Sequence, residues 1–583
     1  MRRRMKVSLI AALLAVHCSG VRHPLKSTPV LEPFDLRRIQ AEGEIGRRMN
    51  ITLYQNILKL DLEKDFLKLF RCRSAEPEAR DGFVGTGMLL DALVRFAYAS
   101  RDSEIIRLKS YVAAELLKTQ DSDGYMGIWT PGKRMQGWDT HEGGYIILAL
   151  ANDYALFGEA PSLGAAGNYA DLLISKNVQT ITGLEDAFLA LYRQTRDRRY
   201  LEYCREPFGL HEFRGGSAHH SRHVYGFLER CLMQVYLHRI EPDTRLLYKP
   251  RVAVEHLVNM DGMDVIGTAG MWEHMNTSQE GHDCNGETCA TAYILWLMDA
   301  LLQAEGNPFY GDIMERTLYN ALFAAQSPDG RRLRYFTDTE SAKEYYPDDS
   351  FCCPNNFRRI LSNLPGFLYY RTARGIAVNL YSASKADIEI GRNRITVEQV
   401  TDYPSNGRIT LLIHPSAKSS FDLSLRIPLW CRNATVSLNG EPVKEPVGSG
   451  VFFTIARSWE KGDRVELTLP MAWRIVRGRG RQYGKAALMR GPVVFGMNRS
   501  DNGYLKEGTD IRVDLNSISD PMPDNRFRPG GLKCTAAASD AGGGAWRKLV
   551  FTEFVDPEGI KTFFLPAGEE SRIIDDEFVT RHY

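Results

Sequence analysis

The 583-residue sequence has few cysteines, almost no net charge and no long apolar run after its first 20 residues. Ten cysteines over this length are too few for a disulfide-stapled scaffold. Lys and Arg number 73 and Asp and Glu 72, a formal net charge of +1, which excludes a chain dominated by nucleic-acid binding. Without an apolar run of ~20 residues, no transmembrane segment is expected. The 44% hydrophobic and 25% charged residues are typical of a globular protein of two or three domains.

The first 20 residues have the pattern of an export signal. Arginines and a lysine at positions 2–6 precede a short apolar stretch over 7–16, followed by His17 and Cys18. The stretch is too short for a membrane anchor, so residues 1–20 are predicted to be a signal peptide. The mature chain is then periplasmic or extracellular. Cys18 is a candidate lipid attachment point, although His17 stands where a small residue is preferred.

Residues 46–372 are predicted to be helical. Apolar residues recur there at spacings of three and four. The clearest segments are 88–100, 145–157, 184–195, 227–239 and 292–304. Repeated helical hairpins must stack to cover their apolar faces, which gives an open solenoid or a closed ring. We expect an α/α toroid of the six-hairpin barrel type, because a ring provides one concave site at its centre.

After residue 372 the hydrophobic period changes from 3.6 to two. Short alternating segments separated by turn signals, such as Asn439-Gly440, predict an antiparallel β-sandwich over 373–500. Residues 501–583 contain further strand-like segments and form either a small second β-domain or an addition to the first. The lead-in over 21–45 can contribute a strand. The predicted fold class is therefore a multidomain α plus β chain, with the toroid followed by β-sandwich domains.

Two cysteine clusters are the strongest chemical signal. The first contains Glu287 and Cys289, immediately before a predicted helix, and the second is the adjacent pair Cys352 and Cys353. Adjacent cysteines rarely bond to each other. Three thiolates and a carboxylate suit a tetrahedral Zn²⁺ site. Disulfide pairing that involves these cysteines and Cys284 is the alternative reading.

One glutamate and two histidine groups also stand out. Glu273 lies in an irregular loop beside Trp272, where desolvation would raise its pKa as a general acid requires, although a loop glutamate is more often simply solvated. His141 and the group that contains His220 and His223 open predicted helices. In a toroid this places them on one rim or in the bore, where they can contact sugar hydroxyls.

At this point the sequence resembles glycoside hydrolase family 127, whose characterised members include bacterial β-L-arabinofuranosidases. The similarity extends from about residue 80 to 500. The motifs that carry it are Asp123-Gly124-Tyr125, Gly183-Leu184-Glu185, Glu287-Thr288-Cys289-Ala290, Cys352-Cys353-Pro354 with Asn356, Thr401-Asp402-Tyr403-Pro404, Arg426-Ile427-Pro428, Trp459-Glu460-Lys461-Gly462-Asp463 and Met489-Arg490-Gly491-Pro492. Asn355 departs from the pattern, since relatives often have a second proline there.

The resemblance implies a fold, a cofactor and roles for particular residues. The family fold is an α/α toroid followed by β-sandwich domains. The resemblance assigns Zn²⁺ to Glu287, Cys289, Cys352 and Cys353, with Cys352 also the nucleophile. The remaining roles it implies are the acid/base at Glu273, with Glu280 as the alternative, and sugar contacts at His141, His223 or its competitor His220, and Tyr335.

The sequence therefore predicts an exported retaining exo-glycoside hydrolase. Its expected partner is a carbohydrate, and β-L-arabinofuranose is the best single terminal sugar. Two alternatives stay open at this stage. One is a toroid polysaccharide lyase that uses a Tyr/His base, and the other is a non-catalytic carbohydrate-binding protein that keeps the fold and the zinc.

Overall fold

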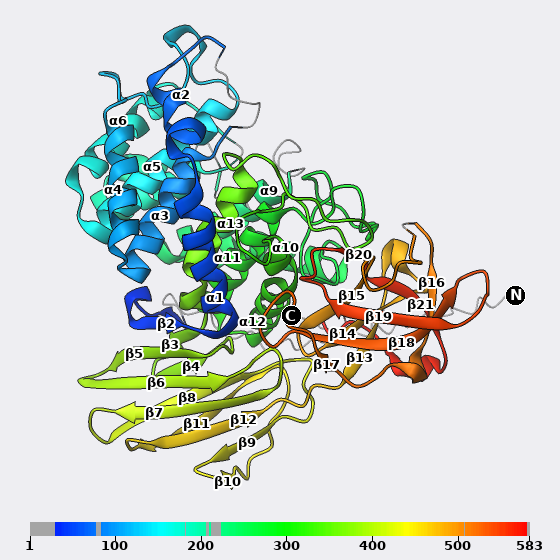
Figure 1. Ribbon diagram of the computed structural model, residues 1–583. Helices are drawn as coiled ribbons and strands as arrows, with labels where there is room; N and C mark the ends of the chain where they lie inside the picture. The colour runs from blue at the N-terminus through cyan, green and yellow to red at the C-terminus, as the bar shows by residue number, and fades with distance from the viewer. Residues whose placement is uncertain are drawn as a thin grey trace, which may run out of the picture.

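The computed structural model describes residues 30–76, 83–180, 182–205, 209–210, 223–506 and 508–579. A helical domain is followed by two β-rich units, one below it and one beside it (Figure 1). This arrangement confirms the predicted fold class. The expected signal peptide with Cys18, and also His220, lie outside the described residues.

Within the described residues, six helices form a closed ring around the bore of the helical domain. Each packs against the next, and the last returns to pack on the first. In chain order these inner helices are α3 (Thr86–Ser100), α5 (Trp138–Phe157), α7 (Leu184–Thr195), α9 (Val224–Ile240), α11 (Thr288–Glu305) and α13 (Cys352–Asn363). The ring is therefore a toroid and not an open solenoid.

A second layer of helices surrounds this ring. The outer helices are α1 (Gly43–Ile51), α4 (Ser103–Leu117), α6 (Ala160–Ser175), α8 (Arg198–Arg205), α10 (Tyr248–Asn259) and α12 (Pro308–Thr317), and the short α2 (Lys68–Arg71) precedes the first inner helix. Because inner and outer helices alternate along the chain as hairpins, the inner helices run parallel and begin at one rim. None of the described helices is long and apolar enough to cross a membrane.

The β-sandwich packs below the toroid (Figure 1). In the described chain one sheet has the order β1 (Glu32–Pro33), β3 (Tyr369–Arg371), β4 (Gly375–Val378), β8 (Ser419–Ile427) and β11 (Val451–Trp459). The other has the order β10 (Glu441–Pro442), β9 (Thr435–Leu438), β12 (Asp463–Thr468), β7 (Arg408–Pro415), β6 (Asn393–Thr401), β5 (Ser384–Ile390) and β2 (Ile39–Ala41). The lead-in thus supplies an edge strand to each sheet.

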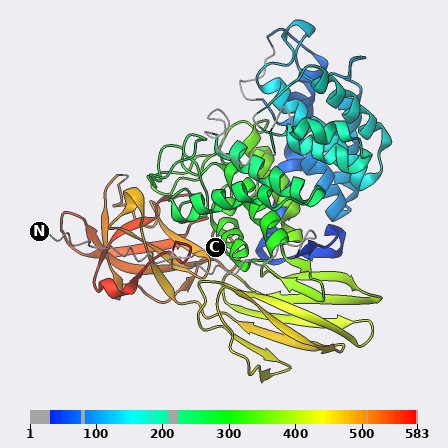
Figure 2. The ribbon, with the colours of Figure 1, turned by 180° about the vertical axis from the view of Figure 1, so that it is seen from behind.

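The C-terminal β-unit is a separate sheet beside the toroid (Figure 2). Its strands are β13 (Trp473–Arg477), β14 (Ala486–Arg490), β15 (Val493–Asn498), β16 (Ile511–Asp514), β17 (Met522–Pro523), β18 (Leu532–Asp540), β19 (Arg547–Glu553), β20 (Gly559–Lys561), β21 (Phe563–Ala567) and β22 (Ile573–Ile574). The sheet closes on itself because β14 pairs with both β15 and β21. The predicted boundary at residue 500 falls after β15 and so cuts this sheet, since strand alternation reveals a strand but not its partner.

A buried ion network joins the sandwich to the toroid. Arg426 on β8 is fully buried and forms ion pairs with Asp312 and Glu315 of α12, the latter at 2.7 Å. Its Nε donates to the Asn379 carbonyl at 2.6 Å. The Arg426 guanidinium therefore neutralises two buried carboxylates. Buried charges of this kind are costly when one partner is removed.

We expect Arg426→Met to lower the free energy of unfolding by about 3 kcal/mol, because it leaves two buried carboxylates unpaired. Denaturant unfolding and the melting temperature measure the loss. Arg408→Met, at an exposed position on β7, is the matched control and should change either quantity little. Equal stability of the two variants would contradict the role assigned to the network.

Candidate active site

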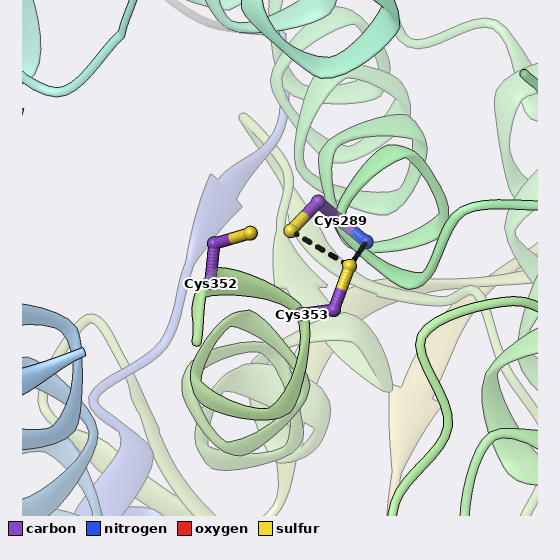
Figure 3. A group of neighbouring side chains, drawn as sticks. All are labelled: Cys289, Cys352 and Cys353. Atoms are coloured by element: carbon purple, nitrogen blue, oxygen red, sulfur yellow. Dashed lines mark hydrogen bonds between the residues drawn. The ribbon is translucent and has the colours of Figure 1, made fainter. Parts of the chain in front are cut away.

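Three cysteine thiols meet at the rim of the toroid where the inner helices begin. Cys352 and Cys353 are the first two residues of α13, and Cys289 is the second residue of α11. Their sulfur atoms all lie within 4.8 Å of one another, and Cys353 Sγ is 3.2 Å from Cys289 Sγ. Figure 3 shows the sulfur of Cys352 pointing toward that of Cys289. All nine described cysteines are free thiols, so this structure does not adopt the disulfide alternative.

The helix ends favour negative charge on this cluster. Neither α11 nor α13 has a side-chain N-cap, so backbone N–H groups at both ends are available to the sulfur atoms. The Cys289 N–H donates to Cys353 Sγ at 3.3 Å. Hydrogen bonds from Cys289 and Cys353 hold the pKa of Cys352 well below its usual range, although burial opposes them. Burial raises the pKa of the other two thiols.

Glu287 completes a donor set that suits a metal ion. It is the N-cap residue of α11 and is fully buried, and its Oε1 lies 3.8 Å from Cys353 Sγ. Its Oε2 is buried and has no hydrogen-bond partner among the described residues, and burial raises the pKa of the carboxyl well above its usual range. A bound cation would satisfy this orphaned oxygen. The buried cluster is therefore consistent with a metal site, and three sulfurs with one carboxylate match the preferences of zinc.

Glu273 projects from the tip of a tight turn. Met271 and His274 exchange two backbone hydrogen bonds of 3.0 Å, with Trp272 and Glu273 between them. Both central residues have positive φ, at 51° and 63°, as a type I′ turn requires. Such a conformation is uncommon for residues with side chains and is found where a functional group must be held in place.

The Tyr335 hydroxyl bridges Glu273 and Cys352. It donates a short hydrogen bond to Glu273 Oε1 and lies 3.3 Å from Cys352 Sγ. Burial raises the pKa of Glu273, and the hydrogen bond from Tyr335 opposes that change. A thiol and a carboxyl thus contact the same oxygen atom, one group at the start of α13 and the other on the turn.

Two of the predicted histidines lie at the same rim. His223 is the N-cap residue of α9, and its Nε2 is 3.9 Å from Glu273 Oε2. His141 lies in the first turn of α5, and its Nε2 is 3.0 Å from the Tyr225 hydroxyl and 3.2 Å from Thr182 Oγ1. Burial lowers the pKa of each histidine to about 4, so both rings are neutral at pH 7.

Two other predicted groups point elsewhere. Glu280 faces the C-terminal β-unit, where its Oε1 lies 3.8 Å from Arg481 Nε. Cys284 contributes its carbonyl, which accepts from the Trp272 N–H at 3.1 Å, and its thiol is not part of the sulfur cluster. Of the two candidate acids, only Glu273 is therefore beside the thiols.

Sequence reasoning missed two contacts that hold the site together. Asn356, one turn into α13, donates from Nδ2 to Cys289 Sγ at 3.2 Å, and its Oδ1 accepts from Arg359 at 2.8 Å. Tyr225 orients His141 and stacks on Tyr293, with ring centroids 5.6 Å apart. Asn356 belongs to the motif Cys352-Cys353-Pro354 with Asn356, and its spacing of three from Cys353 could have indicated that it lies on the same helix face. No sequence signal pairs Tyr225 with His141.

Comparison with known families identifies two matching regions. Residues 48–366, more than half of the chain, match the model described as the β-L-arabinofuranosidase GH127 catalytic domain. Residues 375–471 match the GH127 middle domain. The latter range ends before β13, in agreement with the separate C-terminal sheet.

Individual relatives agree with these matches. The chain is 25% identical over 487 residues to a non-reducing end β-L-arabinofuranosidase of Bifidobacterium longum subsp. longum. The match covers 69% of this chain and 73% of the relative. A crystal structure of a GH127 β-L-arabinofuranosidase from Geobacillus stearothermophilus T6 superposes with a TM-score of 0.77 at 21% identity, over 91% of this chain and 100% of that one. The GH127 β-arabinofuranosidase BT3674 gives a TM-score of 0.79 at 20% identity, over 94% and 100%. These two structures establish a shared fold.

Proposed function

The chain belongs to glycoside hydrolase family 127, and from this premise we propose that it releases terminal β-L-arabinofuranose from glycans with retention of configuration. The sugar follows from the activity named for the relatives. The observation that carries the retaining course is the contact of Cys352 and Glu273 with one Tyr335 hydroxyl. Retaining glycosidases hold their two reacting groups about 5–5.5 Å apart, whereas inverting enzymes leave room for a water molecule. Two groups that touch one oxygen atom fit the retaining arrangement.

The residues divide the reaction into two steps. In the first, the Cys352 thiolate attacks the anomeric carbon, and Glu273 donates its proton to the departing glycosidic oxygen. The product is a thioglycosyl-enzyme and the free aglycone. In the second, Glu273 takes a proton from water, whose oxygen attacks the anomeric carbon and expels the Cys352 thiolate. The raised pKa of Glu273 supports its acid role, because the carboxyl must be protonated at the start.

We further propose that Glu287, Cys289, Cys352 and Cys353 hold Zn²⁺. When bound, zinc keeps coordinated thiols deprotonated, which supplies the nucleophile in its reactive form. The support is the convergence of three sulfur atoms and the Glu287 carboxylate, which contacts Cys353 through one oxygen and leaves the other without a partner among the described residues. Asn356 holds Cys289 in position, and Arg359 in turn holds Asn356. The sulfur geometry therefore depends on two residues that are not proposed ligands.

We expect Asn356→Leu to weaken zinc affinity by about 10–100-fold, because it removes the hydrogen bond to Cys289 Sγ. Competition with a coloured chelator measures the affinity without any substrate. Asn363→Leu, on the same helix but bonded to Trp296 at 2.9 Å, is the matched control and should bind zinc as the wild type does. Unchanged affinity in Asn356→Leu would remove this residue from the site.

His141, His223 and Tyr335 are proposed to contact the bound sugar. The two neutral rings can each donate or accept a hydrogen bond, as sugar hydroxyls require. We also propose that the chain is exported, with Cys18 as a candidate lipid attachment point. The basic and apolar pattern of residues 1–20 supports export, and N-terminal sequencing of secreted protein tests it.

The first experiment is release of p-nitrophenol from the aryl β-L-arabinofuranoside by purified protein. Release with β-L-arabinose as the first-formed product supports both the sugar and the retaining course, and NMR of the early product distinguishes the anomers. Release of the α-anomer first would overturn the two-step mechanism. Cleavage of other pentosides or hexosides in its place would overturn the sugar assignment and keep the family.

A further inference from the structure

The toroid has a second opening at the rim opposite the cysteine cluster. A cavity of about 750 Å³ lies where the inner helices end, and residues from all six of them line it. The lead-in segment 33–36 lies at its edge. No residue of the cysteine cluster lines this cavity. Tyr293 is one of the lining residues. Its ring stacks on Tyr225, and the Tyr225 hydroxyl is hydrogen-bonded to His141 of the catalytic rim.

Four arginines line this rear cavity, and two of them are paired with a carboxylate. Arg359 Nε lies 2.8 Å from Asp91 Oδ2, and Arg95 Nε lies 3.0 Å from the same oxygen. Arg359 also bonds Asn356, which makes it part of the scaffold of the catalytic rim. These two arginines are structural.

The other two, Arg193 on α7 and Arg239 on α9, have donors to spare. Their guanidinium carbons lie 4.9 and 5.4 Å from the centre of the Tyr236 ring, so two positive charges contact the same aromatic ring. Arg193 makes no hydrogen bond or ion pair with any other described residue. Arg239 donates to the Ala300 carbonyl at 3.1 Å, and its buried Nε has no partner in the part of the chain that the structure describes. A buried donor such as Arg239 Nε is expected to be satisfied by a ligand or by water.

Asp186 attracts Arg193 and Asp299 attracts Arg239, but neither carboxylate forms an ion pair with these arginines in the described structure. Asp299 accepts hydrogen bonds from Tyr370 at 2.7 Å and from Gln303 at 2.8 Å. Asp186 faces Arg359 at 4.0 Å. Inner helix C-termini attract cations through the helix dipole, which accounts for arginines at this rim. That attraction does not account for guanidinium donors without acceptors.

We propose that the rear cavity binds a sugar acid, a saccharide ring that carries a carboxylate. Arg193 and Arg239 present planar donors that match a carboxylate, while Asp186 offers an acceptor for a ring hydroxyl. Aromatic side chains of Tyr98 and Trp296 form part of the wall. The volume admits a whole saccharide, and the Asp186 carboxylate opposes a dianion such as phosphate more than it opposes the single negative charge of a sugar acid. The site thus recognises acidic residues of a glycan at a position remote from hydrolysis.

Binding of D-galacturonate to the full chain tests the proposal, with D-galactose and inorganic phosphate as matched probes. Calorimetry or ligand-observed NMR measures each affinity. We expect galacturonate to bind at least about tenfold more tightly than galactose or phosphate, the usual value of one charged hydrogen bond. Equal binding of galactose, or tighter binding of phosphate, overturns the proposal. This comparison uses only wild-type protein, so it does not depend on any variant folding.

Substitution then places the site. Arg193→Gln and Arg239→Gln should each weaken galacturonate binding by about tenfold and leave arabinofuranoside hydrolysis unchanged. Arg198→Gln, on the same hairpin but exposed to solvent, is the control and should change neither quantity. Undiminished galacturonate binding in both cavity variants would place the sugar acid elsewhere and overturn the assignment.

Discussion

Cys352→Ala is expected to leave the fold intact and to reduce hydrolysis by at least about 10⁴-fold, the usual result of removing a nucleophile. The Cys352 side chain is small and lies at the first position of α13, so its loss removes little packing. What it removes is the thiolate beside Tyr335 and one sulfur of the cluster. Turnover of the aryl arabinofuranoside and the circular dichroism spectrum measure activity and fold separately.

A buried thiol away from the rim provides the control. Cys231 on α9 is 2% exposed and is packed in the hydrophobic core, so Cys231→Ala should cost stability without removing activity. Trapping adds a positive test. Mass spectrometry of wild-type enzyme with a slow substrate should find a pentosyl adduct on the peptide that contains Cys352. Full activity of Cys352→Ala, or an adduct on another residue, would overturn the nucleophile assignment.

The helical and β-rich parts of the fold were predictable because each has a local period. Segments such as 145–157 and 292–304 repeat apolar residues at helical spacing, and they became α5 and α11. Ring closure requires α13 to pack on α3, more than 250 residues earlier, which no local pattern reports. The same limit explains β13–β15, which lie within the range predicted for the sandwich but also pair with strands beyond residue 500.

The candidate site was predictable where chemistry demands rare residues in a fixed order. Glu287, Cys289 and the Cys352–Cys353 pair are unusual enough to be found by inspection. The structure brings the three thiols together, with Glu287 in contact with Cys353. A turn with two positive φ angles directs Glu273 toward Tyr335, whereas Glu280 faces Arg481. Residue spacing cannot reveal such a turn. Tyr225 carries no sequence signal of its role, because only three-dimensional contact pairs it with His141.

Glu273→Gln is expected to slow hydrolysis of natural glycans by about 10²–10⁴-fold, the usual contribution of a general acid and base. The amide keeps the shape of the side chain and its contact with Tyr335 but cannot donate or accept the reacting proton. Glu280→Gln is the matched control, because Glu280 pairs with Arg481 and does not reach the thiols. Loss of activity in that variant alone would exchange the two assignments.

The leaving group separates the two duties of Glu273. An activated aryl leaving group departs without protonation, so the first step of Glu273→Gln should be nearly normal with p-nitrophenyl substrate and severely slowed with an alkyl arabinoside. The second step still needs a base to activate water, so the thioglycosyl-enzyme should accumulate as a burst of p-nitrophenol. Added azide needs no deprotonation and should restore turnover as a glycosyl azide. Equal slowing of both substrates, without a burst or azide rescue, would show that Glu273 positions Tyr335 and transfers no proton itself.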